Sequence, residues 1–305
     1  MIENVLTVGN YVLSLFVLIA VGFVCKKTKL LTETSVKDMT NFVLYIVTPC
    51  VIINSYQTEY DSELLYGLII TISAAIVSFG VNIALAHLLV KDKDKRREKT
   101  LRFGAVFSNC GYMSLPLQSA LLGETGVFYG ATYIAVFQVV LWTYGVILMS
   151  GSLKNISLKK IILSPGVTST TIGIVLYVFS VKLPFTILEP MKHLAALNTP
   201  IPMVIVGFHL AGASLKISGF SAYVSSVLRL IVSPLMMVLG LYICGISGDV
   251  AVACTIAASA PVAAATTMFS DKFDGDTTLS ATIVSLTTII SIITMPLVVA
   301  LAGVI

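Results

Sequence analysis

The feature that most constrains this chain is its series of long stretches without a charged side chain. A helix that crosses the hydrocarbon core of a bilayer needs about 20 apolar residues, and its backbone polar groups must find partners within the protein. Ten charge-free stretches approach or exceed that length, at residues 4–25, 39–58, 64–90, 103–123, 125–153, 161–181, 193–215, 230–248, 250–270 and 277–305. We therefore predict an all-α polytopic membrane protein with ten transmembrane helices.

The charged residues are too few to cover a surface that faces water. They make up 11% of the 305 residues, against about 25% in soluble domains. The basic run at 91–99 is interleaved with acids, so we interpret it as a solvated loop, with lipid headgroup contact as the alternative, and expect no nucleic-acid partner. The five cysteines are scattered without C-x-x-C spacing, so we expect no metal site and no cofactor.

The distribution of basic residues predicts the orientation in the membrane. Of the 19 Lys and Arg residues, 16 lie in loops after odd-numbered stretches, Lys216 among them, while Lys182 and Lys192 follow the sixth. Because basic loops stay on the cytoplasmic side, we expect a multi-pass protein of the cytoplasmic membrane with both termini extracytoplasmic. We interpret Arg229, just before the eighth stretch, as reaching to the cytoplasmic interface.

The two halves of the chain share a plan. Residues 1–150 and 161–305 each hold five stretches, joined by a short cytoplasmic linker at 151–160. An odd number of spans per half means that the second half enters the membrane inverted. In both halves the fourth stretch has small and polar residues around a mid-stretch proline, Pro116 and Pro261. Inverted repeats with interrupted helices in matching positions are typical of secondary transporters.

Each of these prolines removes a backbone donor and clashes with the carbonyl four residues back. We predict that the fourth and ninth helices break at Pro116 and Pro261 and cross there, so that helix N-termini with free N–H groups face an anion at mid-membrane. A simple kink at each proline is the alternative. Eleven residues form the predicted substrate site: Asn109, Gly111, Ser114, Pro116, Ser259, Pro261, Thr266, Thr267, Thr48, Asn54 and Gln138.

Several of these side chains also have a structural interpretation. Asn109 could cap the broken helix or contact the ligand, and the two roles are compatible. The hydroxyls of Ser259, Thr266 and Thr267 could donate to a ligand or hold helices together. Gln138 is costly in mid-membrane unless it meets a partner or lines a wet cavity.

The segments "RFGAVFSNCGYMSLPLQSALLGETG" at 102–126, "WTYG" at 142–145 and "APVAAATTMFSDKF" at 260–273 resemble the auxin efflux carrier family. The likeness covers nearly the whole chain and is closest to the short bacterial members called malate or malonate permeases; the family is related to the bile acid:sodium symporters. The resemblance implies two inverted five-helix repeats, crossed broken helices 4 and 9, elevator-type movement, an organic-anion substrate and homodimers.

The chain departs from its relatives in two respects. The plant members have a long central cytoplasmic loop, whereas only residues 151–160 join the halves here. The sodium-binding relatives use acidic and amide ligands near the crossover, whereas Val262 and three alanines follow Pro261 here. The coupling ion, sodium or proton, therefore stays open.

These observations favour a carrier for a small carboxylate anion, malate-, malonate- or auxin-like, that works by alternating access. A membrane sensor or scaffold that binds an organic anion without moving it is the alternative. An enzyme is not expected, because the sequence has no HExxH or GxSxG motif and no paired carboxylates within a charge-free stretch.

Overall fold

The computed structural model describes residues 2–212 and 219–303, and every regular element among them is helical. Lys216, which was counted above among the basic loop residues, lies outside the described residues. The elements in chain order are α1 (Ile2–Lys27), α2 (Glu33–Phe42), η1 (Val43–Val47), α3 (Thr48–Ser55), α4 (Ser62–Leu89), α5 (Lys95–Val106), η2 (Cys110–Ser114), α6 (Leu115–Val140), η3 (Leu141–Gly145), α7 (Val146–Ser150), η4 (Leu153–Asn155), α8 (Leu158–Ile162), α9 (Pro165–Val178), α10 (Phe185–Ala196), α11 (Pro200–Leu210), α12 (Phe220–Val227), η5 (Leu228–Val232), α13 (Ser233–Ile243), α14 (Gly248–Ser259), α15 (Ala265–Lys272) and α16 (Thr277–Ala302).

Among the described residues, seven helical segments are long and apolar enough to cross a membrane. Three of the ten predicted stretches give no separate segment of this kind. The stretch at 103–123 is interrupted after α5, the stretch at 161–181 forms the shorter α9, and the stretch at 250–270 is divided between α14 and α15. The all-helical, multi-pass membrane class is confirmed.

The longest segment, from Cys110 to Ser150, turns back on itself at Gly123. This glycine has a φ of 62°, in the left-handed region that glycine adopts without steric cost. After the turn, a methyl group placed on Gly126 would lie 2.5 Å from the Gln118 carbonyl oxygen, and Gly130 lies against the side chains of Gln118 and Leu115. The two parts of the segment therefore run side by side in opposite directions.

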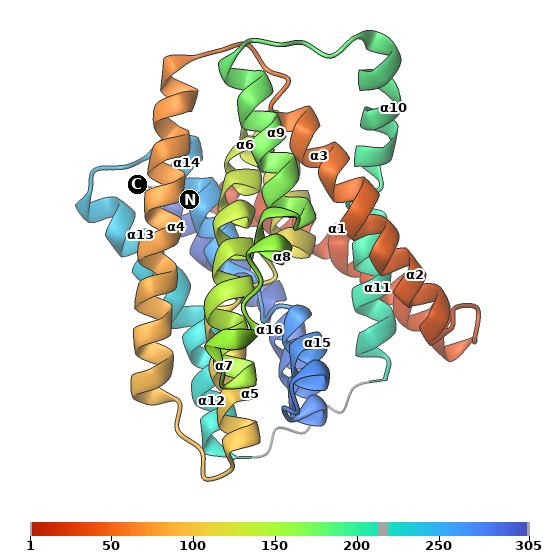
Figure 1. The fold of residues 1–305 in the computed structure, drawn as a ribbon, viewed down its shortest axis with the longest axis vertical. Coiled ribbons are helices and arrows are strands. Elements are labelled where there is room, and N and C mark those ends of the chain that lie inside the picture. The colour runs from red at the N-terminus through yellow and green to blue at the C-terminus, as the bar shows by residue number, and fades with distance from the viewer. Residues whose placement is uncertain (1, 213–218, 304–305) are drawn as a thin grey trace.

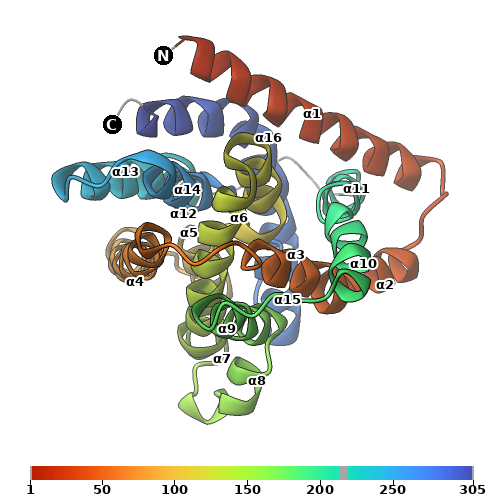
Figure 2. The ribbon, with the colours of Figure 1, turned by 90° about the horizontal axis from the view of Figure 1, so that it is seen from above.

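α1 lies along one side of the molecule beside α11 and α16 (Figure 2). Its closest approach is to α11, where Gly22 faces the backbone of Val204 and Gly207 faces the carbonyl of Ile19. A methyl group at either glycine would overlap the backbone of the other helix. Small residues are what allow two membrane helices to pack with their backbones in contact.

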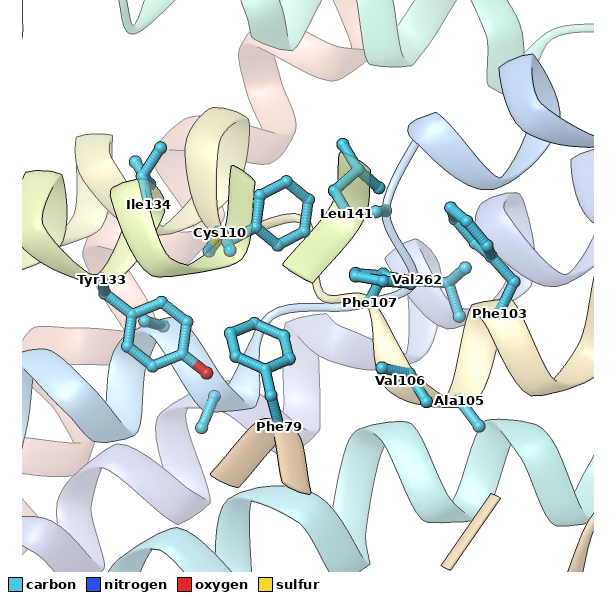
Figure 3. Packing of buried hydrophobic residues seen from close by; sticks show 14 of the residues in the cluster. Phe79, Phe103, Ala105, Val106, Phe107, Cys110, Tyr133, Ile134, Leu141 and Val262 are labelled. Carbon is cyan, nitrogen blue, oxygen red and sulfur yellow. The ribbon is translucent and has the colours of Figure 1, made fainter. Parts of the chain in front are cut away.

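The largest hydrophobic cluster surrounds the interruption between α5 and η2. Phe107, within the interruption, is fully buried, and its ring centroid lies 4.4 Å from that of Phe103 and 5.7 Å from that of Phe137. Figure 3 shows Phe107 next to Val262, which comes from a second interruption far along the chain. The irregular backbone is therefore enclosed by protein, as a membrane interior requires.

Charged residues gather at the end of the molecule where α4 leads into α5 (Figure 1). Arg96 pairs with Asp274 at 2.8 Å, and Arg97 lies 3.4 Å from Asp92. Burial raises the pKa of the Asp92 carboxyl, but the backbone N–H of Asp94 and the Arg97 guanidinium outweigh it, so this pKa is below its ordinary value. The Arg96–Asp274 pair attaches the loop before α16 to the first turn of α5, while the Asp92 contacts hold the loop between α4 and α5.

Candidate functional site

Two interruptions of the helices lie side by side and complete each other's hydrogen bonds. The first separates α5 from η2 at residues 107–109, and the second separates α14 from α15 at residues 260–264. Ser108 and Val262 form an antiparallel bridge, in which the Asn109 N–H donates to the Pro261 carbonyl at 2.8 Å and the Ala263 N–H to the Phe107 carbonyl at 2.9 Å. Segments about 150 residues apart in the sequence thus form one structural unit.

The predicted position of the first break is wrong. Pro116 lies at the start of α6 and not in the interruption, which comes seven residues earlier. The turn before it, η2, is a π-helical turn, and π-helical turns also come two residues before Pro49 and Pro234. A π turn shifts the hydrogen bond to the carbonyl five residues back, which relieves the clash that a proline causes in an α-helix. Pro261, in contrast, lies within the second interruption.

Arg229 joins the C-terminal ends of the two helices that precede the interruptions. Its guanidinium donates to the carbonyls of Val106 at 3.0 Å and Ala105 at 3.5 Å, at the end of α5, and to the carbonyl of Ala258 in the last turn of α14. It also donates to the Ser233 hydroxyl at 2.7 Å. The last carbonyls of a helix lack partners within the helix and attract cations, and the guanidinium supplies both a charge and donors.

The interpretation of Arg229 as an interfacial residue is therefore wrong. The side chain is 1% exposed, and its partners within residues 2–212 and 219–303 are three carbonyls and a hydroxyl, with no carboxylate among them. The predicted stretches were defined as runs without a charged residue, so a buried charge necessarily ends a stretch. For this reason the eighth stretch was predicted to begin at residue 230, although the helical run extends over 220–243. The uncharged residues 217–228 just before it are the signal that places the arginine inside the membrane.

At the starts of the helices that follow the interruptions, η2 and α15, two polar groups lack partners within the described part of the chain. Asn109 precedes η2, makes no capping hydrogen bond and is 5% exposed. Among the described residues, neither its amide nitrogen nor the hydroxyl of Thr266, in the first turn of α15, has a hydrogen-bond partner. A buried polar group without a partner costs about 1–3 kcal/mol. Each interruption is therefore followed by a helix start with one such group, which is suited to a ligand that supplies the missing acceptor.

Space for a ligand lies beside Gly111, two residues after Asn109. Gly111 is partly exposed, and no atom lies within 4 Å of where its β-carbon would be. An open cavity of about 250 Å³, which no residue of either interruption lines, is bordered by Tyr11 and Ser14 of α1 and by Pro116 and Ser119 of α6. A ligand can therefore approach the backbone at the start of η2 closely.

The other predicted site residues divide into two groups. Ser114 donates to the Ile256 carbonyl at 3.2 Å and so ties η2 to α14, while Ser259 donates to the same carbonyl at 3.0 Å. Thr267, in the first turn of α15, is partly exposed near the second interruption. The remaining three lie on other elements, with Thr48 and Asn54 in α3 and Gln138 packed against Gly166 of α9.

Sequence reasoning missed a second buried polar side chain, Gln118. Its amide nitrogen donates to the Ala253 carbonyl at 2.8 Å and so joins α6 to α14. Its carbonyl oxygen has no partner among the described residues. An amide two residues after Pro116, within the charge-free stretch 103–123, was the available signal.

Comparison with known proteins connects this geometry to a family. A family model described as membrane transport protein matches residues 7–159 and 149–299. The chain is similar to the uncharacterized transporter MJ1031 of Methanocaldococcus jannaschii, with 27% identity over 302 residues that cover 94% of this chain and 96% of that protein. It is also similar to an uncharacterized transporter of Methanothermobacter thermautotrophicus, with 23% identity over 292 residues that cover 94% and 95% of the two chains.

Proposed function

Because the chain belongs to the membrane transport protein family, we propose that it is a secondary transporter that moves a small organic carboxylate anion across the cytoplasmic membrane. The observation that carries the proposal is that each of the paired interruptions is followed by a helix start with a buried donor, and that neither donor has a partner among the described residues. Helix N-termini bind anions through free N–H groups and the positive end of the helix dipole. A carboxylate is therefore suited to this position without a lysine or arginine of its own.

The substrate carboxylate accepts hydrogen bonds from the Asn109 amide and the Thr266 hydroxyl in this proposal. Gly111 leaves room for it beside the first turn of η2. Ser114, Ser259 and Pro261 hold the surrounding backbone, because the two hydroxyls donate to the Ile256 carbonyl and the Pro261 carbonyl accepts from the Asn109 N–H. Pro116 borders the open cavity between α1 and α6, and Thr267 adds a second hydroxyl. Malate, malonate and indole acids are the first candidates, since the resemblance implies organic anions.

The arrangement in the membrane completes the proposal. We propose ten spans in two inverted repeats, residues 1–150 and 161–305, which are joined by the linker at 151–160 and cross at helices 4 and 9. The antiparallel pairing of the interruptions, each within the fourth span of its half, supports this arrangement. The basic residues of the odd-numbered loops support extracytoplasmic termini. Elevator-type alternating access and a homodimer follow from the family resemblance.

The test has two steps. Purified protein is first screened by thermal unfolding against dicarboxylates, indole acids and bile acids, because a ligand that binds the folded state raises the unfolding temperature. The best carboxylate is then supplied as a radiolabelled compound to proteoliposomes. Saturable uptake that is lost in Asn109→Ala supports a carrier. Binding without uptake would identify a sensor or scaffold instead, and neither binding nor uptake would overturn the proposal.

A further inference from the structure

Arg229 is a buried cation without a buried anion. A charge inside a membrane protein is costly unless it is paired, and within residues 2–212 and 219–303 this guanidinium has only carbonyl and hydroxyl acceptors. Two of those carbonyls belong to the last turn of α5 and one to the last turn of α14. The charge is therefore balanced by the negative ends of two helix dipoles and not by a side chain.

The C-terminal ends of two interrupted helices form a cation-binding position. Each helix end carries about half a negative charge, and two ends that meet combine their fields and their free carbonyl oxygens. In secondary transporters, half-helix C-terminal ends and unwound carbonyls coordinate the coupling sodium ion or proton. The acceptors of the Arg229 guanidinium here, three carbonyls and a hydroxyl, are of the kind that bind such a cation.

We propose that the Arg229 guanidinium is a resident cation, which fills the position of a coupling sodium ion and keeps α5 and α14 joined without one. Because this cation is covalently attached, it does not dissociate during the transport cycle. Sodium is therefore not required for stability or for transport. A sodium gradient does not drive the movement of the carboxylate, which follows the electrochemical gradient of the carboxylate itself. Arg229 is a positioning residue, since it acts through the ends of the two helices.

The transport part of this inference depends on the proposed function, whereas the stability part does not. We therefore test stability first, with purified protein in sodium chloride or in choline chloride of equal ionic strength. The wild type should unfold at the same temperature in both salts. Arg229→Ala should unfold at a lower temperature, and millimolar ethylguanidinium chloride or sodium chloride should restore part of the loss. Such rescue would not occur if Arg229 only filled space.

The matched control is Arg102→Ala, which removes a guanidinium that lies outside the paired interruptions. The Arg102 guanidinium donates to the Val90 carbonyl at 3.1 Å and to the Glu98 carboxylate at 2.7 Å. Ethylguanidinium should not restore this variant selectively. Three results would each overturn the inference. They are stabilisation of the wild type by sodium, a wild-type unfolding temperature for Arg229→Ala, and failure of every cation to restore the stability of Arg229→Ala.

If Arg229→Ala does not fold, Arg229→Lys replaces it. An ammonium keeps the charge, so this variant should fold and show no sodium dependence, and a sodium requirement in Arg229→Lys would overturn the inference. Uptake of the carboxylate into proteoliposomes with and without sodium is measured last and should be equal. Absence of uptake in both conditions would contradict the proposed function but would leave the stability result readable.

Discussion

Replacing Asn109 by alanine should weaken ligand binding and at the same time leave the free protein as stable as before or more stable. The Asn109 side chain is 5% exposed, its amide nitrogen has no partner among the described residues, and it makes no capping bond. An unpaired buried polar group costs about 1–3 kcal/mol, and Asn109→Ala removes that cost. The backbone bond from the Asn109 N–H to Pro261 is independent of the side chain and is retained.

The loss of affinity can be estimated from the same contact. A hydrogen bond from an amide to a carboxylate contributes about 1.5–3 kcal/mol, which corresponds to about a 10- to 150-fold increase in Kd. Binding of the carboxylate found in the thermal screen is measured by titration calorimetry, and stability by the unfolding temperature without ligand. Opposite changes in the two quantities distinguish a binding group from a structural one.

The matched control is Asn82→Ala, because Asn82 is also a buried amide but donates to Ser78 within α4 at 3.5 Å. This variant should keep the wild-type Kd and gain no stability. The reasoning is refuted if Asn109→Ala binds the carboxylate with wild-type affinity, or if it loses more stability than Asn82→Ala.

Three further substitutions test other parts of the structure. Gly111→Leu should fold normally, because open space lies beside this residue, but should block carboxylate binding; wild-type affinity in a calorimetric titration would contradict the proposed position of the ligand. Gly207→Ala should destabilise the protein by about 1–3 kcal/mol, because the new methyl group overlaps the α1 backbone, whereas Gly80→Ala, with nothing within 4 Å, should be neutral or stabilising by up to about 1 kcal/mol. The pKa of Asp92 is lowered in the folded state, so its contribution to stability is complete above the unfolded pKa of about 4 and is lost as the pH falls through the lower folded pKa. As the pH is lowered from about 5 to about 3, the unfolding temperature of Asp92→Asn should therefore fall less steeply than that of the wild type. An equal fall in both proteins would contradict the lowered pKa of Asp92.

The helical membrane class follows from the sequence because it depends on a local property. A stretch of about 20 residues without charge is enough to predict a span, and most of the predicted stretches correspond to helical segments of the structure. The positions of the interruptions depend on more than the local sequence. Pro116 stays helical because a π turn precedes it, while Phe107 to Asn109 leave the helix because Pro261 and its neighbours provide hydrogen-bond partners.

The contacts of Arg229 are a second feature that the local sequence does not determine. Its position inside a helical run could be read from the uncharged residues on both sides, but its carbonyl acceptors lie on helices more than 20 residues before and after it in the chain. A single sequence does not specify which side chain lies between the ends of two helices. Thr48 and Asn54 were selected as polar side chains near Pro49, and Gln138 as a polar side chain at mid-span. Neither criterion distinguishes a residue beside α9 from one at the paired interruptions.

The most direct test of the paired interruptions as an anion site is an experimental structure of the protein with the carboxylate that stabilises it most. Our account predicts density for the carboxylate at the starts of η2 and α15, within hydrogen-bond distance of the Asn109 amide nitrogen and the Thr266 hydroxyl, with the Arg229 guanidinium still bonded to the ends of α5 and α14. A carboxylate bound to Arg229, or bound away from both interruptions, would contradict it.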